Sequence, residues 1–280
     1  MKTGLVLEGG AMRGMYTAGV LDIFLDNDIR MDLVAGVSAG ALFGVNYLSG
    51  QRGRVIRYNQ RFNRDKNYMG LRPLLREGNL FNTQYAYEEV PHRLDPFDDE
   101  AFRRSGVPFF AVVTNVETGE PEYIRVESVF DQMDILRASG SMPLVSRPVE
   151  INGKRYLDGG IADSIPFAWL SAQGCDKLLV ILTRAADYRK KPMPAAFAKL
   201  CGRQHPMVAK KLLERHALYN RSLDLLKQWE HEGKAFVIRP SRPIKIGRLE
   251  KDPEKLQKVY ELGLADGAAS LEALREYWMR

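Results

Sequence analysis

Ser38 lies midway between two glycines, Gly36 and Gly40, in a G-x-S-x-G pattern. An apolar run, residues 33–35, precedes the pattern and a helix-forming run, residues 41–43, follows it, so the serine is expected in a sharp turn between a strand and a helix. In such a nucleophile elbow the glycines let strand and helix pack closely while the hydroxyl projects from the turn. The pattern therefore predicts a nucleophilic serine.

A second candidate is the glycine-rich turn that follows the apolar run 5–7 and precedes an amphipathic helix. Its residues are Glu8, Gly9, Gly10, Ala11, Met12, Arg13 and Gly14. Such a turn can present backbone N–H groups to a phosphate or to the oxyanion of an acyl-transfer intermediate. The dinucleotide spacing G-x-G-x-x-G fails at its second glycine, where Ala11 stands. An oxyanion hole needs a nucleophile one βα unit later, and Ser38 lies there.

The serine hydroxyl is a weak nucleophile and needs a proton acceptor. Asp158 ends an apolar run after a predicted hairpin, and Gly159 and Gly160 behind it allow a tight turn toward another loop. From spacing alone, a catalytic aspartate and an ordinary Asp-Gly turn are equally good interpretations. The four histidines lie in polar or basic surroundings outside any motif, which is typical of surface histidines: His92, His205, His216 and His231.

Strand-like and helical runs alternate through the first two thirds of the chain. Predicted strands are 5–7, 33–35, 109–113, 136–139 and 178–182, and predicted helices include 15–25 and 41–48. This alternation predicts an α/β fold with a mainly parallel central sheet and helices on both faces. Residues 51–102 read as an irregular insertion with short helices, and Asn-Gly at 152–153 predicts a hairpin.

The remaining chain predicts a helical C-terminal extension with one short strand at 236–238 and a closing helix near 255–278. We expect residues 1–185 to form a catalytic core and residues 186–280 to pack on it without being an independent domain. The uncharged run 33–51 is nearly long enough to span a bilayer, but its glycines and polar residues favour a buried strand and helix instead.

Composition favours a cytoplasmic protein. Cys175 and Cys201 are far apart and lack C-x-x-C spacing, so neither a disulfide framework nor a zinc site is expected. The apolar run at the N-terminus is too short for a signal peptide. Metal-ligand spacing is absent from the sequence, and we expect neither a metal nor a cofactor.

The formal net charge is +6. Basic residues concentrate between residues 184 and 221, a segment that contains ten Lys and Arg but only two acidic residues. A solvated helical face explains such a run. The alternative is peripheral contact with an anionic membrane at its inner face, since each basic residue near the surface contributes about 1 kcal/mol. No nucleic-acid-binding module accompanies the charge, so a nucleic-acid partner is not expected.

Together the turn at residues 9–14, the elbow at 36–40 and the triplet at 158–160 resemble the patatin-like phospholipase family. Residues 114–119 and 138–143 are similar to stretches that this family has between elbow and aspartate. The resemblance covers roughly residues 5–185, and such a joint match is more specific than any single motif. It implies a patatin-like three-layer sandwich.

This resemblance also implies a serine acyl hydrolase for lipid carboxyl esters, either phospholipid or acylglycerol, with a Ser–Asp dyad. Ser38 would attack the ester carbonyl and Asp158 would act as base, without a histidine. The oxyanion hole would comprise Gly9, Gly10 and Ala11, and the supporting residues would be Arg13, Gly14, Gly36, Gly40, Gly159 and Gly160. The family usually has a third glycine where this chain has Ala11, whose methyl group would narrow or distort the hole if positive φ is needed there.

Two alternatives stay open. A Ser–His–Asp triad esterase would use His205, His216 or His231, although an elbow at residue 38 leaves too little chain for the strands that normally precede it in α/β-hydrolases. A membrane-binding or partner-binding protein would have a site weakened at Ala11.

Overall fold

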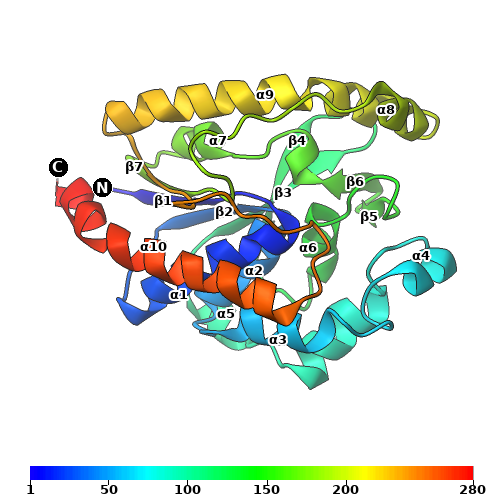
Figure 1. Cartoon of the computed structure of the whole chain (residues 1–280), viewed down its shortest axis with the longest axis horizontal. Coiled ribbons are helices and arrows are strands. Elements are labelled where there is room, and N and C mark those ends of the chain that lie inside the picture. Colours follow the sequence, from blue (N-terminus) through cyan, green and yellow to red (C-terminus); the bar gives the residue numbers. More distant parts are fainter. Residues whose placement is uncertain (280) are drawn as a thin grey trace.

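One sheet organises the chain in the computed structural model, which describes residues 1–279 (Figure 1). Within these residues its eight strands lie in the order β5-β6-β3-β2-β1-β7-β8, and β4 also pairs with β3. The strands are β1 (Thr3–Leu7), β2 (Leu33–Val37), β3 (Phe109–Asn115), β4 (Pro121–Val126), β5 (Val149–Ile151), β6 (Lys154–Asp158), β7 (Lys177–Ile181) and β8 (Ala235–Ile238).

The centre of the sheet is parallel, as the sequence predicts. β3, β2, β1, β7 and β8 pair in parallel, whereas β4, β5 and β6 are antiparallel. Parallel strands need both faces covered, which accounts for the almost continuous apolar sequences of β1, β2 and β7.

Helices cover both faces of the sheet and give three layers (Figure 1). α7 (Phe167–Ala172) and α9 (Pro206–His231) cover one face, while α1 (Met15–Asp26), α2 (Ala39–Leu48) and α10 (Pro253–Met279) cover the other. The other helical segments are η1 (Ala11–Gly14), α3 (Arg54–Phe62), α4 (Leu71–Glu77), η2 (Tyr85–Leu94), α5 (Asp99–Arg104), α6 (Met133–Ser139), η3 (Gly159–Ile161) and α8 (Ala195–Gly202).

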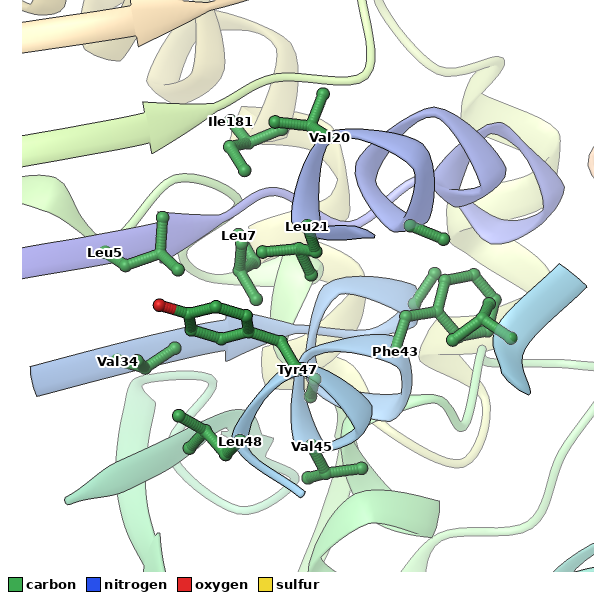
Figure 2. Close-up of a cluster of buried hydrophobic side chains, with 14 of the residues drawn as sticks. Leu5, Leu7, Val20, Leu21, Val34, Phe43, Val45, Tyr47, Leu48 and Ile181 are labelled. Carbon is green, nitrogen blue, oxygen red and sulfur yellow. The ribbon is translucent and has the colours of Figure 1, made fainter. Parts of the chain in front are cut away.

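The core follows the two-residue period of the strands. Leu5 and Leu7 of β1 pack toward α1 and α2, where they join Leu21 and Tyr47 (Figure 2). Val6, between them, points to the other face and packs in the cluster beneath α9. This alternation fixes β1 in the middle of the sandwich and places its C-terminal end beside that of β2.

The strand predicted at residues 136–139 is wrong, because this segment is the second half of α6. A four-residue apolar run does not distinguish a buried strand from a buried helix, and Leu, Arg and Ala are strong helix formers. β4 was not predicted because its residues are mostly half-buried and carry charges. The hairpin is confirmed: Asn152 and Gly153 both have positive φ, 49° and 76°, between β5 and β6.

Residues 33–51 form β2 and α2, as predicted, rather than one continuous helix. Within residues 1–279 no helix has the length and apolarity that crossing a bilayer requires. The insertion at 51–102 consists of the short helices α3, α4, η2 and α5, again as predicted.

α10 lies against α1 so closely that the two backbones are in contact. A Cβ atom on Gly19 would lie 2.2 Å from the carbonyl oxygen of Tyr260, and one on Gly263 would lie 2.1 Å from that of Tyr16. Only glycine permits this approach. The expectation that residues 186–280 are not an independent domain stays a prediction, which this contact and the pairing of β8 with β7 support.

Candidate active site

Strand pairing brings Ser38 and Asp158 together. β2 and β6 share one edge of β3, since β4 occupies the other: Val37 pairs with Val112, and Asp158 pairs with Val113, one residue further along. Ser38 follows Val37 directly, so the end of β2 meets the end of β6. The Ser38 Oγ donates a hydrogen bond of 2.7 Å to Oδ2 of Asp158.

The backbone at Ser38 has the strained conformation of a nucleophile elbow. Its φ is 53° and its ψ is −122°, a combination that costs an L-residue about 1–3 kcal/mol. A Cβ atom on Gly36 would lie 2.6 Å from Cα of Ala41, and one on Gly40 would lie 2.3 Å from the carbonyl oxygen of Leu7. Both flanking glycines are therefore required by the packing of β2 and α2.

Ser139, at the end of α6, holds this elbow in place. Its hydroxyl accepts the backbone N–H of Ser38 at 2.9 Å and donates to the carbonyl oxygen of Val112 at 2.7 Å. Sequence reasoning gave Ser139 no role, although it falls in the stretch 138–143 that resembles the family. Its buried hydroxyl links Ser38 to β3.

Asp158 is buried, and both of its carboxylate oxygens have partners. Oδ2 accepts from Ser38, and Oδ1 accepts the N–H of Gly160 at 2.8 Å. Burial raises the pKa of the Asp158 carboxyl, against the opposing effects of the Ser38 hydrogen bond and the positive charge of Arg215. A raised pKa makes the carboxylate a stronger base than a solvated aspartate.

The turn at residues 9–11 lies beside Ser38. A Cβ atom on Gly9 would lie 2.9 Å from Cβ of Ser38, and one on Gly10 would lie 2.7 Å from Oγ1 of Thr183. In the described part of the chain the backbone N–H groups of Gly9, Gly10 and Ala11 have no acceptor. Ala11 has a φ of 48°, so an alanine occupies a left-handed conformation that favours glycine.

Glu8 anchors that turn, and sequence reasoning missed this role. Its Oε1 accepts the hydroxyl of Tyr219 at 2.6 Å, and its Oε2 accepts the N–H of Thr183 at 2.6 Å. The carboxylate thereby joins the ends of β1 and β7 to α9. The sequence did offer a signal: Glu8 is an acidic residue directly after a buried apolar strand. A carboxylate at such a position requires polar partners in the fold.

Arg13 is half-buried behind the turn, and its Nε atom is buried without a hydrogen-bond partner. Burial and the neighbouring charge of Arg184 lower the pKa of Arg13 to about 10, while Glu8 opposes the shift.

Two of the glycines named as supporting residues are closely packed. Gly14 precedes α1, where a Cβ atom would lie 2.7 Å from the ring of Phe43. Gly159 lies against β3, and a Cβ atom there would lie 2.1 Å from the carbonyl oxygen of Val112.

The histidines lie apart from the Ser38–Asp158 pair. His216 lines the same cleft as Ser38, but its Nδ1 lies 2.9 Å from the carbonyl oxygen of Leu213. His205 precedes α9, His92 stacks on Phe130, and His231 is exposed. Among residues 1–279 no histidine nitrogen hydrogen-bonds to Ser38 or Asp158.

Two cavities meet at Ser38. One, of about 150 Å³, is mainly apolar and is lined by α2, η2 and α6, with Phe43, Tyr87 and Leu136 in its wall. The other, of about 680 Å³, is lined by both charged and apolar side chains and is bordered by the turn at residues 8–11, the segment 184–194 and α9. Ser38, Ala11, Met142 and Arg248 line both.

Neither cavity offers a metal-binding cluster. Within residues 1–279 no three His, Cys, Asp or Glu side chains are grouped so that they could hold a metal ion. Cys175 and Cys201 are free and buried.

Comparison with known proteins adds independent findings. A patatin-like phospholipase family model matches residues 5–170, and a domain of unknown function (DUF6363) matches residues 205–279. The uncharacterized protein YjjU of Escherichia coli K12 is 28% identical over 268 residues, which cover 94% of this chain and 75% of that protein.

The lysophospholipase NTE1 of Candida glabrata is 26% identical over 290 residues, which cover 98% of this chain but 16% of the fungal protein. This chain thus corresponds to a small part of the fungal enzyme. The crystal structure of VipD from Legionella pneumophila aligns with a TM-score of 0.47 and 13% identity over 97% of this chain and 67% of that one.

Proposed function

This chain belongs to the patatin-like phospholipase family, and on that premise we propose that it is a serine acyl hydrolase that cleaves lipid carboxyl esters with a Ser38–Asp158 dyad. The family and a lysophospholipase relative support hydrolysis of lipid esters in general. The dyad rests on a single observation, the direct 2.7 Å hydrogen bond from Ser38 Oγ to the buried Asp158 carboxylate.

In the proposed first step, Ser38 Oγ attacks the ester carbonyl carbon and transfers its proton to Oδ2 of Asp158. The hydrogen bond already joins the proton to its acceptor, and the raised pKa of Asp158 favours the transfer. The carbonyl oxygen becomes an oxyanion opposite the unpaired N–H groups of Gly9, Gly10 and Ala11.

Collapse of the tetrahedral intermediate expels the alcohol, which takes the proton back from Asp158 and leaves an acyl ester on Ser38. Water then attacks this ester with Asp158 again as base, and a second collapse releases the carboxylic acid and restores the Ser38 hydroxyl. The net reaction consumes one ester and one water, and it yields one acid and one alcohol. Arg13 and Ser139 would position the turn and the elbow.

We assign the apolar cavity to the acyl chain. An apolar cavity of about 150 Å³ holds a ligand the size of benzene, so this volume suits a segment of about six carbon atoms. Activity on p-nitrophenyl esters should therefore be highest for acyl chains of about six to eight carbons. A flat chain-length profile would contradict this assignment.

The dyad is tested with Ser38→Ala and Asp158→Asn proteins, beside Ser241→Ala as a control at an exposed serine. We expect Ser38→Ala to abolish both hydrolysis and labelling by a fluorophosphonate, and Ser241→Ala to retain both. Labelling of Ser38 in the parent would also exclude the alternative of a binding protein with a weakened site, because only an activated serine reacts readily. Retained hydrolysis in Ser38→Ala would remove the serine from the mechanism.

A triad is tested by replacing His205, His216 and His231 together with Gln. The dyad predicts that hydrolysis survives, because in the described residues no histidine hydrogen-bonds to Ser38 or Asp158. Loss of activity in a folded triple variant would favour the triad.

Peripheral contact of a cytoplasmic protein with an anionic membrane is also a proposal. Exposed basic side chains in α8, α9 and the preceding segment lie beside exposed apolar ones, which is the composition of an interfacial surface. The basic residues are Lys191, Lys199, Arg203, Lys210 and Arg221, and the apolar ones are Phe197, Leu200, Met207 and Leu213. Sedimentation with phosphatidylglycerol vesicles, compared with phosphatidylcholine vesicles, should fall when Lys199, Arg203 and Lys210 become Gln; equal sedimentation would refute the contact.

A further inference from the structure

Basic residues of the run at 184–221 line the larger cleft beside Ser38 rather than only facing solvent. Arg184, Lys190 and Arg215 line the cleft, where they meet Arg13 from the turn and Arg248 from the loop before α10. The first four are half-buried, and Arg248 is exposed at the edge. The acidic residues of this cleft are Glu8, Asp158 and Asp187.

These five cations lack carboxylate partners. Arg189 forms a salt bridge of 2.5 Å with Asp224, but within residues 1–279 no carboxylate lies within 4.0 Å of any of the five. Two acids of the cleft already accept hydrogen bonds from other groups. Glu8 accepts from Tyr219 and Thr183, and Asp158 accepts from Ser38 and Gly160. Positive charge thus accumulates beside Ser38, where Glu8 and Asp158 offset part of it through space but form no ion pair with any of the five.

The charges are close enough to act on one another. Burial and the charges of Arg215, Arg248 and Arg13 lower the pKa of Lys190 to about 7, although Glu8 opposes the shift. Lys190 is therefore only partly protonated at about pH 7, and a bound anion would favour its charged form. Burial also lowers the pKa of Arg215. Half-buried cations that repel one another are costly, and an anion bound among them would remove that cost.

Two of these cations, Lys190 and Arg215, are held in position before any ligand arrives. Lys190 is fixed through its backbone, whose N–H donates to Oδ1 of Asn220 at 2.9 Å and whose carbonyl accepts from Nδ2 of Asn220 at 3.1 Å. Its ammonium lies 4.1 Å from the ring centre of Tyr219. Arg215 donates through Nε to the carbonyl oxygen of Gly160, two residues after Asp158. Preorganisation reduces the entropy lost on binding.

We infer that this cleft is a phosphate subsite, and that the substrates are acyl esters bearing a phosphate group near the scissile bond. This inference rests on the proposed function. Its geometric basis is that Ser38 lies where an apolar cavity joins a cationic cleft, so an acyl chain and a phosphate fit on opposite sides of one ester. Several unpaired cations match an anionic phosphomonoester such as that of an acylglycerol phosphate, and they disfavour the positive charge of a choline head group.

Binding is tested first, without catalysis, on the Ser38→Ala protein. Calorimetric titration with glycerol 3-phosphate and with inorganic phosphate should give binding that chloride at equal ionic strength does not reproduce. Lys190→Gln or Arg248→Gln in this background should weaken binding about tenfold each, as expected for loss of one charged hydrogen bond. Lys227→Gln, an exposed position on α9 outside the cleft, serves as the matched control, and Lys190→Arg should restore binding.

Substrate choice is tested next, with octanoyl esters of glycerol 3-phosphate, glycerophosphocholine and glycerol, which stay monomeric and so separate the subsite from membrane contact. We expect kcat/KM to be at least tenfold higher for the phosphomonoester than for the choline ester, and this ratio to fall about tenfold in Lys190→Gln.

The outcomes separate the two proposals. Ester hydrolysis without phosphate binding overturns the subsite and leaves the hydrolase, whereas phosphate binding with equal rates on all three esters overturns the substrate assignment. Phosphate binding in a protein that hydrolyses no ester overturns the hydrolase and leaves the subsite. If inorganic phosphate binds as tightly as glycerol 3-phosphate while the rates do not differ, the cleft binds free phosphate and the substrate assignment is wrong. Folding of each variant is verified by circular dichroism, and Arg248→Gln gives an independent test if Lys190→Gln does not fold.

Discussion

Replacing Asp158 by Asn should lower activity and raise stability in the same protein. The asparagine side chain has the shape of aspartate, and both existing contacts can be satisfied: its oxygen accepts the N–H of Gly160, and its NH₂ donates to Ser38 Oγ. The substitution therefore removes the negative charge and the basicity while leaving the packing unchanged.

The expected loss of activity follows from general base catalysis. A positioned base contributes about 10²–10⁴-fold, or roughly 3–5 kcal/mol of transition-state stabilisation, and Asn cannot accept the Ser38 proton. The parent enzyme should show kcat/KM falling as pH drops through the raised pKa of Asp158, because the carboxyl must be ionised to act as base.

The stability of Asp158→Asn should change in the opposite direction to its activity. Because burial raises the pKa of Asp158 in the folded protein, ionisation is easier in the unfolded chain, and the folded state of the parent loses stability as pH rises through that pKa. Each tenfold change in acidity corresponds to about 1.4 kcal/mol. Asp158→Asn does not ionise, so it should be more stable than the parent at pH 7. The advantage should vanish below about pH 4, where the carboxyl is protonated in both states.

The measurements are thermal unfolding from pH 3 to pH 8 and p-nitrophenyl ester hydrolysis for the parent and Asp158→Asn. If the variant is less stable than the parent at pH 7, burial of the ionised Asp158 carboxylate does not destabilise the folded protein, and the reasoning is refuted. A variant with full activity would refute the role of Asp158 as base.

Three further predictions concern the glycines and the elbow. Ser38→Gly should be more stable than Ser38→Ala by about 1 kcal/mol in denaturant unfolding, the reverse of the usual order, because φ at this position is 53°; equal stability would contradict strain at the elbow. Ser139→Ala should lower kcat at least about tenfold in ester hydrolysis, because the Ser38 N–H and the Val112 carbonyl lose their partner; an unchanged kcat would show that the elbow holds without it. Gly263→Val should lower the free energy of unfolding by about 3 kcal/mol or more, whereas Gly247→Ala, where a Cβ meets nothing within 4 Å, should not.

The parallel sheet and the elbow could be predicted from the sequence because each depends on local patterns. Buried apolar strands, the Asn-Gly hairpin and the G-x-S-x-G turn are specified within a few residues. The segment 136–139 shows where local reasoning fails, since its apolar run fits a strand or a helix and tertiary packing decides in favour of α6.

The meeting of Ser38 and Asp158 could not be derived from spacing, because 120 residues separate them. It depends on β2 and β6 sharing one edge of β3, which is a property of the sheet order. The same limit applies to Glu8 and Tyr219, whose hydrogen bond joins residues 211 positions apart. In both cases the sequence identifies residue types with chemical potential, and only the topology shows their partners.

The C-terminal third therefore contributes more residues to the cleft beside Ser38 than the extent of the family match suggests. The patatin-like model ends at residue 170 and includes Ser38, Asp158 and the turn at residues 9–11, but of the five cleft cations it includes only Arg13. Arg215 and Arg248 fall in the segment that matches a domain of unknown function, as does Tyr219, which holds Glu8. If the cleft selects phosphate-bearing esters, the reaction belongs to the family core and the choice of substrate to this C-terminal segment. Substitution of Arg215 or Arg248 should then change the preference for phosphate-bearing esters more than the preference for acyl-chain length. The apolar cavity assigned to the acyl chain is formed mainly by residues before 150.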